Sequence, residues 1–229
     1  MKKTLNQFKV SKVSLWKYYN LEVKDRIIKE AFNLFWRYGI KSVTMDDIAR
    51  ELGISKRTIY QHFTDKNAIV TEVIQSELTS QTFQFDEIEE TNSNPVDQII
   101  QLSAHMRLMM ANINPALLFD LKKYHPEGWQ LFTDYKHQYV IQSVRDNLKN
   151  GIEMLLYRQD IDIEVLARLR IEQIEMAFDP ILFPFEQFNM VDVQIQFINH
   201  FLRGILTPEG FNYYNNLEKT TIESNTHEK

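Results

Sequence analysis

The 229-residue sequence contains no cysteine, and glycine and proline are scarce, with six of each. Without cysteine the chain has no disulfides, zinc–thiolate sites, iron–sulfur clusters or thiol nucleophile. The glycines are all isolated, so neither a GxGxxG motif nor a P-loop is present, and a nucleotide-phosphate site is not expected. No apolar run approaches the roughly 18 residues of a membrane span, and none follows the basic first residues as in a secretory signal. We therefore expect a cytoplasmic protein.

Motifs that indicate catalysis or metal binding are also missing. The six histidines form no HExxH or HxxxH pattern, and the four between residues 105 and 200 fall on separate predicted elements. Glu172 and Glu175 lie three residues apart on one predicted helix, where an exposed charged face explains them better than acid–base catalysis does. We therefore expect no enzyme activity, no bound metal and no cofactor.

Charge is distributed unevenly along the chain. Residues 1–70 carry 14 Lys and Arg against 7 Asp and Glu, whereas residues 71–229 carry 12 against 24. A basic head on an acidic body suggests that the head meets a polyanion, although a basic tail on an ordinary domain gives the same counts.

Apolar residues recur at helical spacing through nearly the whole chain, which predicts an all-α protein. The expected helices cover residues 23–38, 44–52, 55–63, 65–81, 95–110, 115–123, 126–150, 162–178, 190–206 and 208–217. The polar, acidic segment from residue 84 to residue 97 is predicted as a loop up to the helix start at Asn94-Pro95, and the tail from residue 218 as disordered.

Residues 44–63 have the pattern of a helix-turn-helix. Thr44 and Asp47 have the spacing of a capping box, Gly53 ends the first short helix, and Ser55 caps the second. Two helices joined by a short turn that contains glycine form this motif.

The second of these helices has one apolar face and one polar face. Ile59 and Phe63 lie four residues apart and are predicted to face inward, while Arg57 and Gln61 project from the opposite side. The flanking residues, Thr58 and Tyr60, also donate hydrogen bonds, and such side chains contact phosphates or read base edges. This pattern favours DNA binding over a helix-turn-helix that contacts protein.

The segment from Arg26 to Lys66 resembles the DNA-binding domain of the TetR/AcrR family of bacterial transcriptional regulators. The matching residues are Ala31, Phe35, Gly39, the segment Val43 to Ala49, the segment Leu52 to Ser55, Thr58, Ile59, Tyr60, His62, Phe63 and Lys66. The resemblance implies an N-terminal three-helix domain that binds DNA and a larger helical C-terminal domain that binds a ligand and forms a homodimer.

These observations predict three parts of the chain. Residues 21–68 are expected to form the DNA-binding domain and residues 69–229 the ligand-binding and dimerisation domain. Residues 1–20 form a basic N-terminal extension, which either touches DNA or is an upstream stretch added by start-site choice.

The expected DNA contacts divide into two groups. Base readout is expected from Arg57, Thr58 and Gln61, and phosphate contacts from Thr44, Tyr60, His62 and Lys66. Ser55 and Lys56, at the start of the same helix, complete the predicted DNA-binding set.

The C-terminal domain is rich in aromatic residues and methionine. Singly, such residues are usually core, but as a group they fit the ligand chamber of the resembled family, and methionine adapts to varied ligand shapes. The ligand is expected to be apolar or amphipathic. The candidate lining residues are Met106, Met110, Phe119, Tyr124, Trp129, Phe132, Tyr135 and Met176.

The helix predicted for residues 190–206 has two apolar stripes. One stripe can face the core of its own protomer, and the other needs a partner. Together with residues 162–178 it corresponds to the four-helix dimer interface of the resembled family. The candidate interface residues are Val191, Ile195, Ile198, Phe201 and Leu202.

The function that the sequence favours is a ligand-responsive transcriptional repressor. As a homodimer it is expected to bind a pseudo-palindromic double-stranded DNA operator and to release it when a small apolar or amphipathic ligand enters. Two alternatives remain open: a DNA-binding regulator or scaffold without a ligand, and a helical enzyme or carrier with an incidental helix-turn-helix.

Overall fold

The computed structural model describes residues 12–110 and 113–226, and the side chains of residues 23–110 and 113–217. Within these ranges the chain is helical, and the one β feature is an isolated bridge between Tyr157 and Leu206. The all-α prediction is therefore confirmed. The elements are α1 (Lys12–Tyr38), α2 (Met45–Leu52), α3 (Lys56–Tyr60), α4 (Lys66–Thr91), α5 (Pro95–Met110), α6 (Leu117–Tyr124), α7 (Pro126–Tyr135), the π-helix η1 (Lys136–Val140), α8 (Ile141–Glu153), α9 (Ile163–Met176), α10 (Met190–Ile205) and α11 (Pro208–Thr226).

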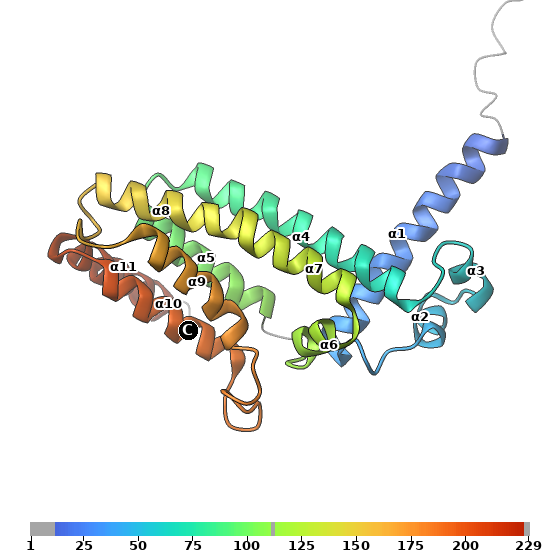
Figure 1. Cartoon of the computed structure of the whole chain (residues 1–229). Helices are drawn as coiled ribbons and strands as arrows, with labels where there is room; N and C mark the ends of the chain where they lie inside the picture. Colours follow the sequence, from blue (N-terminus) through green and yellow to red (C-terminus); the bar gives the residue numbers. More distant parts are fainter. Residues whose placement is uncertain (1–11, 111–112, 227–229) are drawn as a thin grey trace, which may run out of the picture.

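The molecule is elongated, with α1, α2 and α3 at one end and a helical body at the other (Figure 1). α4 runs from the head along the body, and α7, η1 and α8 form one continuous helical stretch beside it. The short α6 lies where head and body meet (Figure 1). Within the described residues this places the helix-turn-helix at one end of the body.

Two segments are helical where the sequence predicted a loop or disorder. Residues 82–91 continue α4 to Thr91, because the segment contains no glycine or proline and its acidic side chains serve as tertiary partners. Tyr139 of η1 donates a hydrogen bond to Asp86 Oδ1 (2.6 Å), and Ser143 of α8 bonds to Glu89. α11 likewise continues past Leu217 to Thr226, since no breaker follows Gly210. The last three residues of the predicted tail and the first eleven of the basic extension lie outside the described residues.

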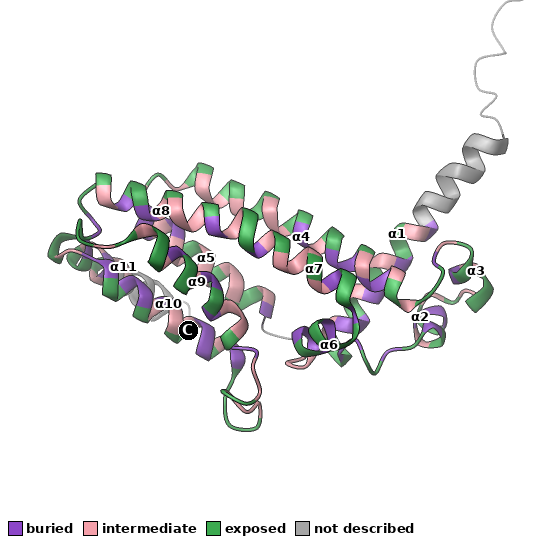
Figure 2. Ribbon diagram, in the orientation of Figure 1, coloured by how far each residue is buried: buried purple, intermediate pink, exposed green. Residues whose placement is uncertain are grey.

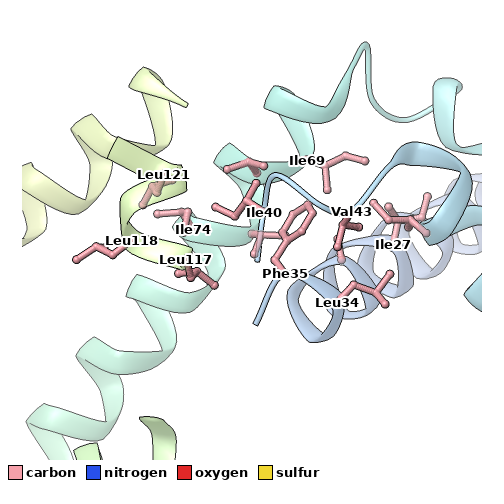
Figure 3. Close-up of a cluster of buried hydrophobic side chains, with 14 of the residues drawn as sticks. Ile27, Leu34, Phe35, Ile40, Val43, Ile69, Ile74, Leu117, Leu118 and Leu121 are labelled. Carbon is pink, nitrogen blue, oxygen red and sulfur yellow. The ribbon is translucent and has the colours of Figure 1, made fainter. Parts of the chain in front are cut away.

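One core joins the head to the near end of the body. Buried residues of α1, the loop that follows it and α4, including Ile27, Phe35, Ile40 and Ile69, pack together (Figure 3). The same core continues into α6 through Leu121 and its neighbours. Apolar contact therefore runs across the junction between α6 and the head without a break.

A second core holds the far end of the body. It is formed by buried residues of α5, α8, α9, α10 and α11, among them Leu148, Ile171 and Leu202, together with Tyr157 between α8 and α9. Buried residues of the body lie mainly on helix faces that look toward other helices, and exposed ones on the outside (Figure 2). Between the two cores the helices enclose open space, which is described below.

Candidate DNA-binding surface and ligand cavity

The turn between α2 and α3 is fixed by local hydrogen bonds and one left-handed glycine. Thr44 Oγ1 accepts the N–H of Asp47 (3.2 Å), and Asp47 Oδ2 accepts the N–H of Thr44 (2.9 Å), which is the predicted capping box. Gly53 ends α2 with φ of 63°, a conformation that costs glycine little. Ser55 Oγ accepts the N–H of Thr58 (3.1 Å) at the start of α3. Each such cap contributes about 1 kcal/mol, so the sequence itself sets both helix starts.

α3 buries one face and leaves the other open. Ile59 is fully buried and Phe63, just after the helix, is nearly so. Arg57, Tyr60 and Gln61 are exposed. Among the residues whose side chains are described, none forms an ion pair or side-chain hydrogen bond with Arg57. The helix is shorter than the expected 55–63, although Phe63 N–H still bonds to Ile59 O (3.0 Å).

Other residues predicted to contact DNA already have partners on the surface. Lys56 Nζ forms an exposed ion pair with Asp46 (2.8 Å). The hydroxyls of Ser55 and Thr58 share a hydrogen bond (2.8 Å). His62, which follows α3, is half-buried. Such exposed pairs contribute little to stability, so a phosphate is able to displace them. Thr44 is exposed, although its hydroxyl takes part in the capping box.

Lys66, which is predicted to contact phosphate, is half-buried and already has partners in its own protomer. Its ammonium donates to the carbonyl of Ile40 and approaches that of Lys41 (3.5 Å), and it lies over the ring of Phe35 (5.9 Å to the centroid). Burial lowers the pKa of Lys66. The side chain therefore ties the start of α4 to the loop after α1, a role that sequence spacing does not reveal.

A cavity of about 200 Å³ lies within the body and is lined mostly by apolar side chains. Its walls come from α4, α5, α6, α7 with η1 and α8, α9 and α10. Of the predicted ligand-binding residues, Met106, Met110, Phe132 and Tyr135 line it. Burial raises the pKa of the Tyr135 hydroxyl, which therefore stays neutral. Because a dry cavity of about 150 Å³ binds benzene, this one has room for a small organic molecule.

Four of the predicted lining residues lie elsewhere. Lys123 Nζ lies 5.3 Å from the ring centroid of Phe119 and 5.4 Å from that of Tyr124, on the outside of α6. Trp129 packs beneath the ammonium of Lys122 (4.9 Å), and Met176 is exposed at the end of α9. The prediction was wrong because helical spacing identifies apolar residues but not the direction in which they face after packing.

The prediction for α10 also needs correction. Ile198, Phe201 and Leu202 are buried within the protomer, and the first two line the cavity. Val191 and Ile195 are half-buried. Because α10 packs against both α5 and α9, its two apolar stripes find partners in the same chain.

Sequence reasoning missed two cationic residues that line the cavity, Lys136 and Arg170. Lys136 is 1% exposed, and its ammonium bonds to Glu175 and to Glu172 Oε1 (3.2 Å). The two carboxylates interpreted as an exposed charged face therefore compensate a buried lysine. No motif marks either cation, since only the packing of η1 and α9 turns them inward.

α6 is bonded to the head on one side and lines the cavity on the other. Asp120 Oδ2 accepts the backbone N–H of Lys41 (2.8 Å), in the loop after α1. His125, at the end of α6, bonds through Nδ1 to Asn67 Oδ1 on α4 (2.6 Å), and burial lowers the pKa of this imidazole. Leu117, Leu118 and Leu121 of the same helix line the cavity. α6 thus touches both the cavity and the head.

Two further searches were confined to the described part of the chain. None of its helices has the length and apolar character needed to cross a membrane. Its histidines, aspartates and glutamates form no group of three or more suited to hold a metal ion.

Comparison with known proteins gives consistent matches. Residues 27–73 match the family model of bacterial regulatory proteins of the tetR family. The HTH-type transcriptional regulator YvaF of Bacillus subtilis is 27% identical over 186 residues, which cover 80% of this chain and 96% of that regulator. An HTH-type transcriptional regulator of Staphylococcus aureus (strain bovine RF122 / ET3-1) is 39% identical over 70 residues, or 31% of this chain and 38% of that protein.

Solved structures share the fold at low sequence identity. A TetR-family regulator from Agrobacterium tumefaciens superposes with a TM-score of 0.68 at 15% identity, covering 82% of this chain and 100% of that one. A transcriptional regulator from Saccharomonospora viridis in complex with choline gives a TM-score of 0.66 at 20% identity, covering 82% and 99%.

The fold, the helix-turn-helix and these matches define a DNA-binding transcriptional regulator. Residues 27–73 form a domain of the tetR family of bacterial regulatory proteins.

Proposed function

We propose that the chain is a ligand-responsive repressor that binds a pseudo-palindromic operator as a homodimer and leaves it when a small apolar or amphipathic molecule enters the body. Residues 21–68 act as the DNA-binding part and residues 69–229 as the part that binds ligand and dimerises. The observation that carries this proposal is α6, which lines the apolar cavity and is also hydrogen-bonded to the head through Asp120. A filled body without a cavity would have favoured a scaffold without a ligand.

DNA binding is assigned to the exposed face of α3. Arg57, Thr58 and Gln61 are proposed to read bases, while Thr44, Tyr60, His62 and Lys66 hold phosphates, with Ser55 and Lys56 at the start of the helix. In a helix-turn-helix dimer the two reading helices enter successive major grooves, so half-sites lie about 34–36 Å apart or a multiple of that.

Dimerisation is assigned to the outer face of α9, with the half-buried Val191 and Ile195 of α10 beside it. Val165 is 59% exposed, Leu169 48% and Met176 39%, although all three are large and apolar. They lie four and seven residues apart and therefore share one face of the helix. An exposed apolar stripe of this kind fits a partner surface, and α9 with α10 corresponds to the four-helix interface of the family.

Ligand control is assigned to a shift of α6. A molecule in the cavity presses on its leucines, and the shift is passed to the loop after α1 through Asp120 and to α4 through His125. Operator affinity falls if the ligand prefers a head spacing that does not match the DNA. The solved relative in complex with choline supports the capacity of this fold to hold a small molecule.

The first test is selection of double-stranded DNA from a random pool by the purified protein. We expect enrichment of an inverted repeat, because a two-fold symmetric dimer contacts two equivalent half-sites. We propose that the protein acts in a bacterial cytoplasm, where the promoter that it regulates lies. Recovery of sequences without a shared motif, at an affinity equal to that for random DNA, would remove the operator model.

A second test addresses the coupling through α6. Asp120→Ala leaves the Lys41 N–H without its charged acceptor, a bond of about 1.5–3 kcal/mol. We expect the variant to bind operator but to need at least about five-fold more of a cavity ligand for release, since allosteric coupling is typically 1–3 kcal/mol. Fluorescence anisotropy of labelled operator, titrated with ligand, measures this.

The matched control is Asp86→Ala, which removes a carboxylate hydrogen bond from the body, between α4 and Tyr139. The ligand concentration that releases half of the operator should stay within a factor of two of the wild-type value, which corresponds to about 0.4 kcal/mol at about 25 °C. Equal midpoints for wild type and Asp120→Ala would show that α6 does not transmit the signal through this bond.

A further inference from the structure

Arg170 lines the cavity as a cation that has no ion-pair partner among the described side chains. It lies on α9 and lines the cavity together with Val140 and Val144 on the facing helical stretch and Ile198 and Phe201 on α10. Its Nη1 is shielded from solvent and has no hydrogen-bond partner. Within the described side chains no carboxylate forms an ion pair with it.

Several other polar side chains of the cavity are paired, whereas the neutral hydroxyl of Tyr135 is buried without a partner. Glu77 accepts a hydrogen bond from Gln81 Nε2 (3.1 Å), and Glu89 bonds to Ser143. Gln98 Oε1 accepts from Asn147 Nδ2 (2.8 Å). Among the described lining residues, Arg170 is therefore a charged donor that the fold places in the cavity and leaves without an acceptor at Nη1.

Arg170 is half-buried as a residue, but its Nη1 is shielded from solvent without a partner, which is costly and calls for an explanation. Removing a charged group from water costs several kcal/mol unless an opposite charge and hydrogen bonds compensate it. Burial lowers the pKa of Arg170 to about 10, so the guanidinium is still charged at neutral pH. Lys136, on the helical stretch that faces α9, shows how this chain compensates a buried cation, with Glu175 and Glu172. Among the described residues, none supplies a comparable acceptor for Arg170 Nη1.

We propose that the cavity binds a monoanionic amphipathic molecule whose carboxylate pairs with Arg170 while its apolar part lies among the methionines of α5. This rests on the proposed function and names its ligand class. The planar guanidinium fork matches a carboxylate with two parallel hydrogen bonds. Glu77 and Glu89 in the same lining disfavour a phosphate dianion, and one arginine balances one charge.

The size of the cavity limits the apolar part of the ligand. About 200 Å³ is somewhat larger than the engineered cavity of about 150 Å³ that holds benzene. A phenylalkyl or medium-chain carboxylate therefore fits, whereas a long-chain fatty acid requires the helices to move apart. Suitable probes are 3-phenylpropanoate and octanoate.

The experiment compares head groups on the same skeleton. Thermal unfolding is measured with the carboxylate, the alcohol, the ammonium and the phosphate monoester of each probe. A ligand that binds only the folded state raises Tm. For wild type we expect a clear rise with the carboxylates, a smaller one with the alcohols, and none with the ammonium or phosphate compounds.

Variants of Arg170 assign the effect to this side chain. Arg170→Met should weaken carboxylate binding roughly 10–100-fold, the value of a hydrogen bond to a charged group, while alcohol binding is kept. Without ligand its Tm should equal or exceed that of wild type, because an uncompensated charge is removed. Arg170→Lys should bind carboxylates with intermediate affinity. Arg168→Met, which removes an exposed arginine of the same helix, should behave as wild type.

Several outcomes would overturn the inference: no carboxylate stabilises wild type, alcohols or ammonium compounds act more strongly, or Arg170→Met keeps carboxylate affinity. If Arg170→Met does not fold, Arg170→Lys and the wild-type panel decide. Operator release is measured separately with the same probes. If carboxylates bind through Arg170 but do not release DNA, the anion site is supported and the proposed control of DNA binding by a ligand is wrong.

Discussion

Arg57→Ala is expected to weaken operator binding about 5–150-fold, the equivalent of 1–3 kcal/mol for one arginine that reads a base pair. The side chain stands on the exposed face of α3, opposite the buried Ile59, and no described side chain competes for it. Specificity should relax at one position of each half-site, because a bidentate arginine distinguishes guanine from the other bases. Anisotropy titrations with operator and with single-base variants measure both effects.

The control for this variant is Arg158→Ala. Arg158 is also exposed, but it follows α8 at the far end of the body, where it pairs with Asp160 (3.5 Å). It should bind operator as wild type does. Arg57→Lys should recover affinity for all sequences without recovering the preference, since lysine supplies charge but not the guanidinium fork. If Arg57→Ala retains wild-type affinity and selectivity, α3 does not read DNA through this residue.

The head was predictable because its signals are local. The capping box of Thr44 and Asp47, the left-handed Gly53 and the Ser55 cap each depend on residues within four positions of one another. The boundaries of α5, α9 and α10 followed from proline, capping residues and apolar spacing in the same way. Such local interactions can be recognised from a short stretch of sequence, because they do not depend on how the rest of the chain packs.

The direction in which a helix faces was not predictable. Lys66 turns inward to backbone carbonyls, and Met176 points outward although methionine favours cores. Arg170 looks like any surface arginine until α9 packs against the body. These facts depend on how helices far apart in sequence are rotated against one another, and one sequence without structural contacts contains no such information.

The polar segment of α4 shows a related limit. Residues 84–91 contain four acidic residues, which composition alone assigns to a solvated loop. In the fold Asp86 and Glu89 are partners for Tyr139 and Ser143 of the adjacent helical stretch. Polar composition therefore does not distinguish a loop from a helix whose charged side chains are used between helices.

The apolar residues of α10 are buried in the protomer, whereas those on the outer face of α9 are exposed, so a charge should act differently on the two helices. Leu202→Asp is expected to unfold the body, not to give a folded monomer. Leu202 is 1% exposed in the second core, and truncation of such a leucine alone costs about 2–5 kcal/mol. An unpaired buried carboxylate adds to that cost, and the sum approaches the 5–15 kcal/mol of a whole domain. Circular dichroism should show loss of helix or a fall in Tm of more than about 10 °C, at 2–4 °C per kcal/mol.

Leu169→Asp is the matched variant on the proposed dimer face. Its leucine is 48% exposed, so a charge there remains solvated in the protomer and changes protomer stability by about 0.5 kcal/mol or less. In a dimer the same charge is buried against the partner. We therefore expect a folded monomer by sedimentation, with operator affinity reduced at least about ten-fold because the two half-sites no longer bind as a unit.

Leu202→Met, a swap of similar volume, should fold and dimerise as wild type, at a cost below about 1.5 kcal/mol. A folded, monomeric Leu202→Asp variant would show that α10 forms part of the dimer interface. A Leu169→Asp variant that sediments as wild type would show that the outer face of α9 is not part of it.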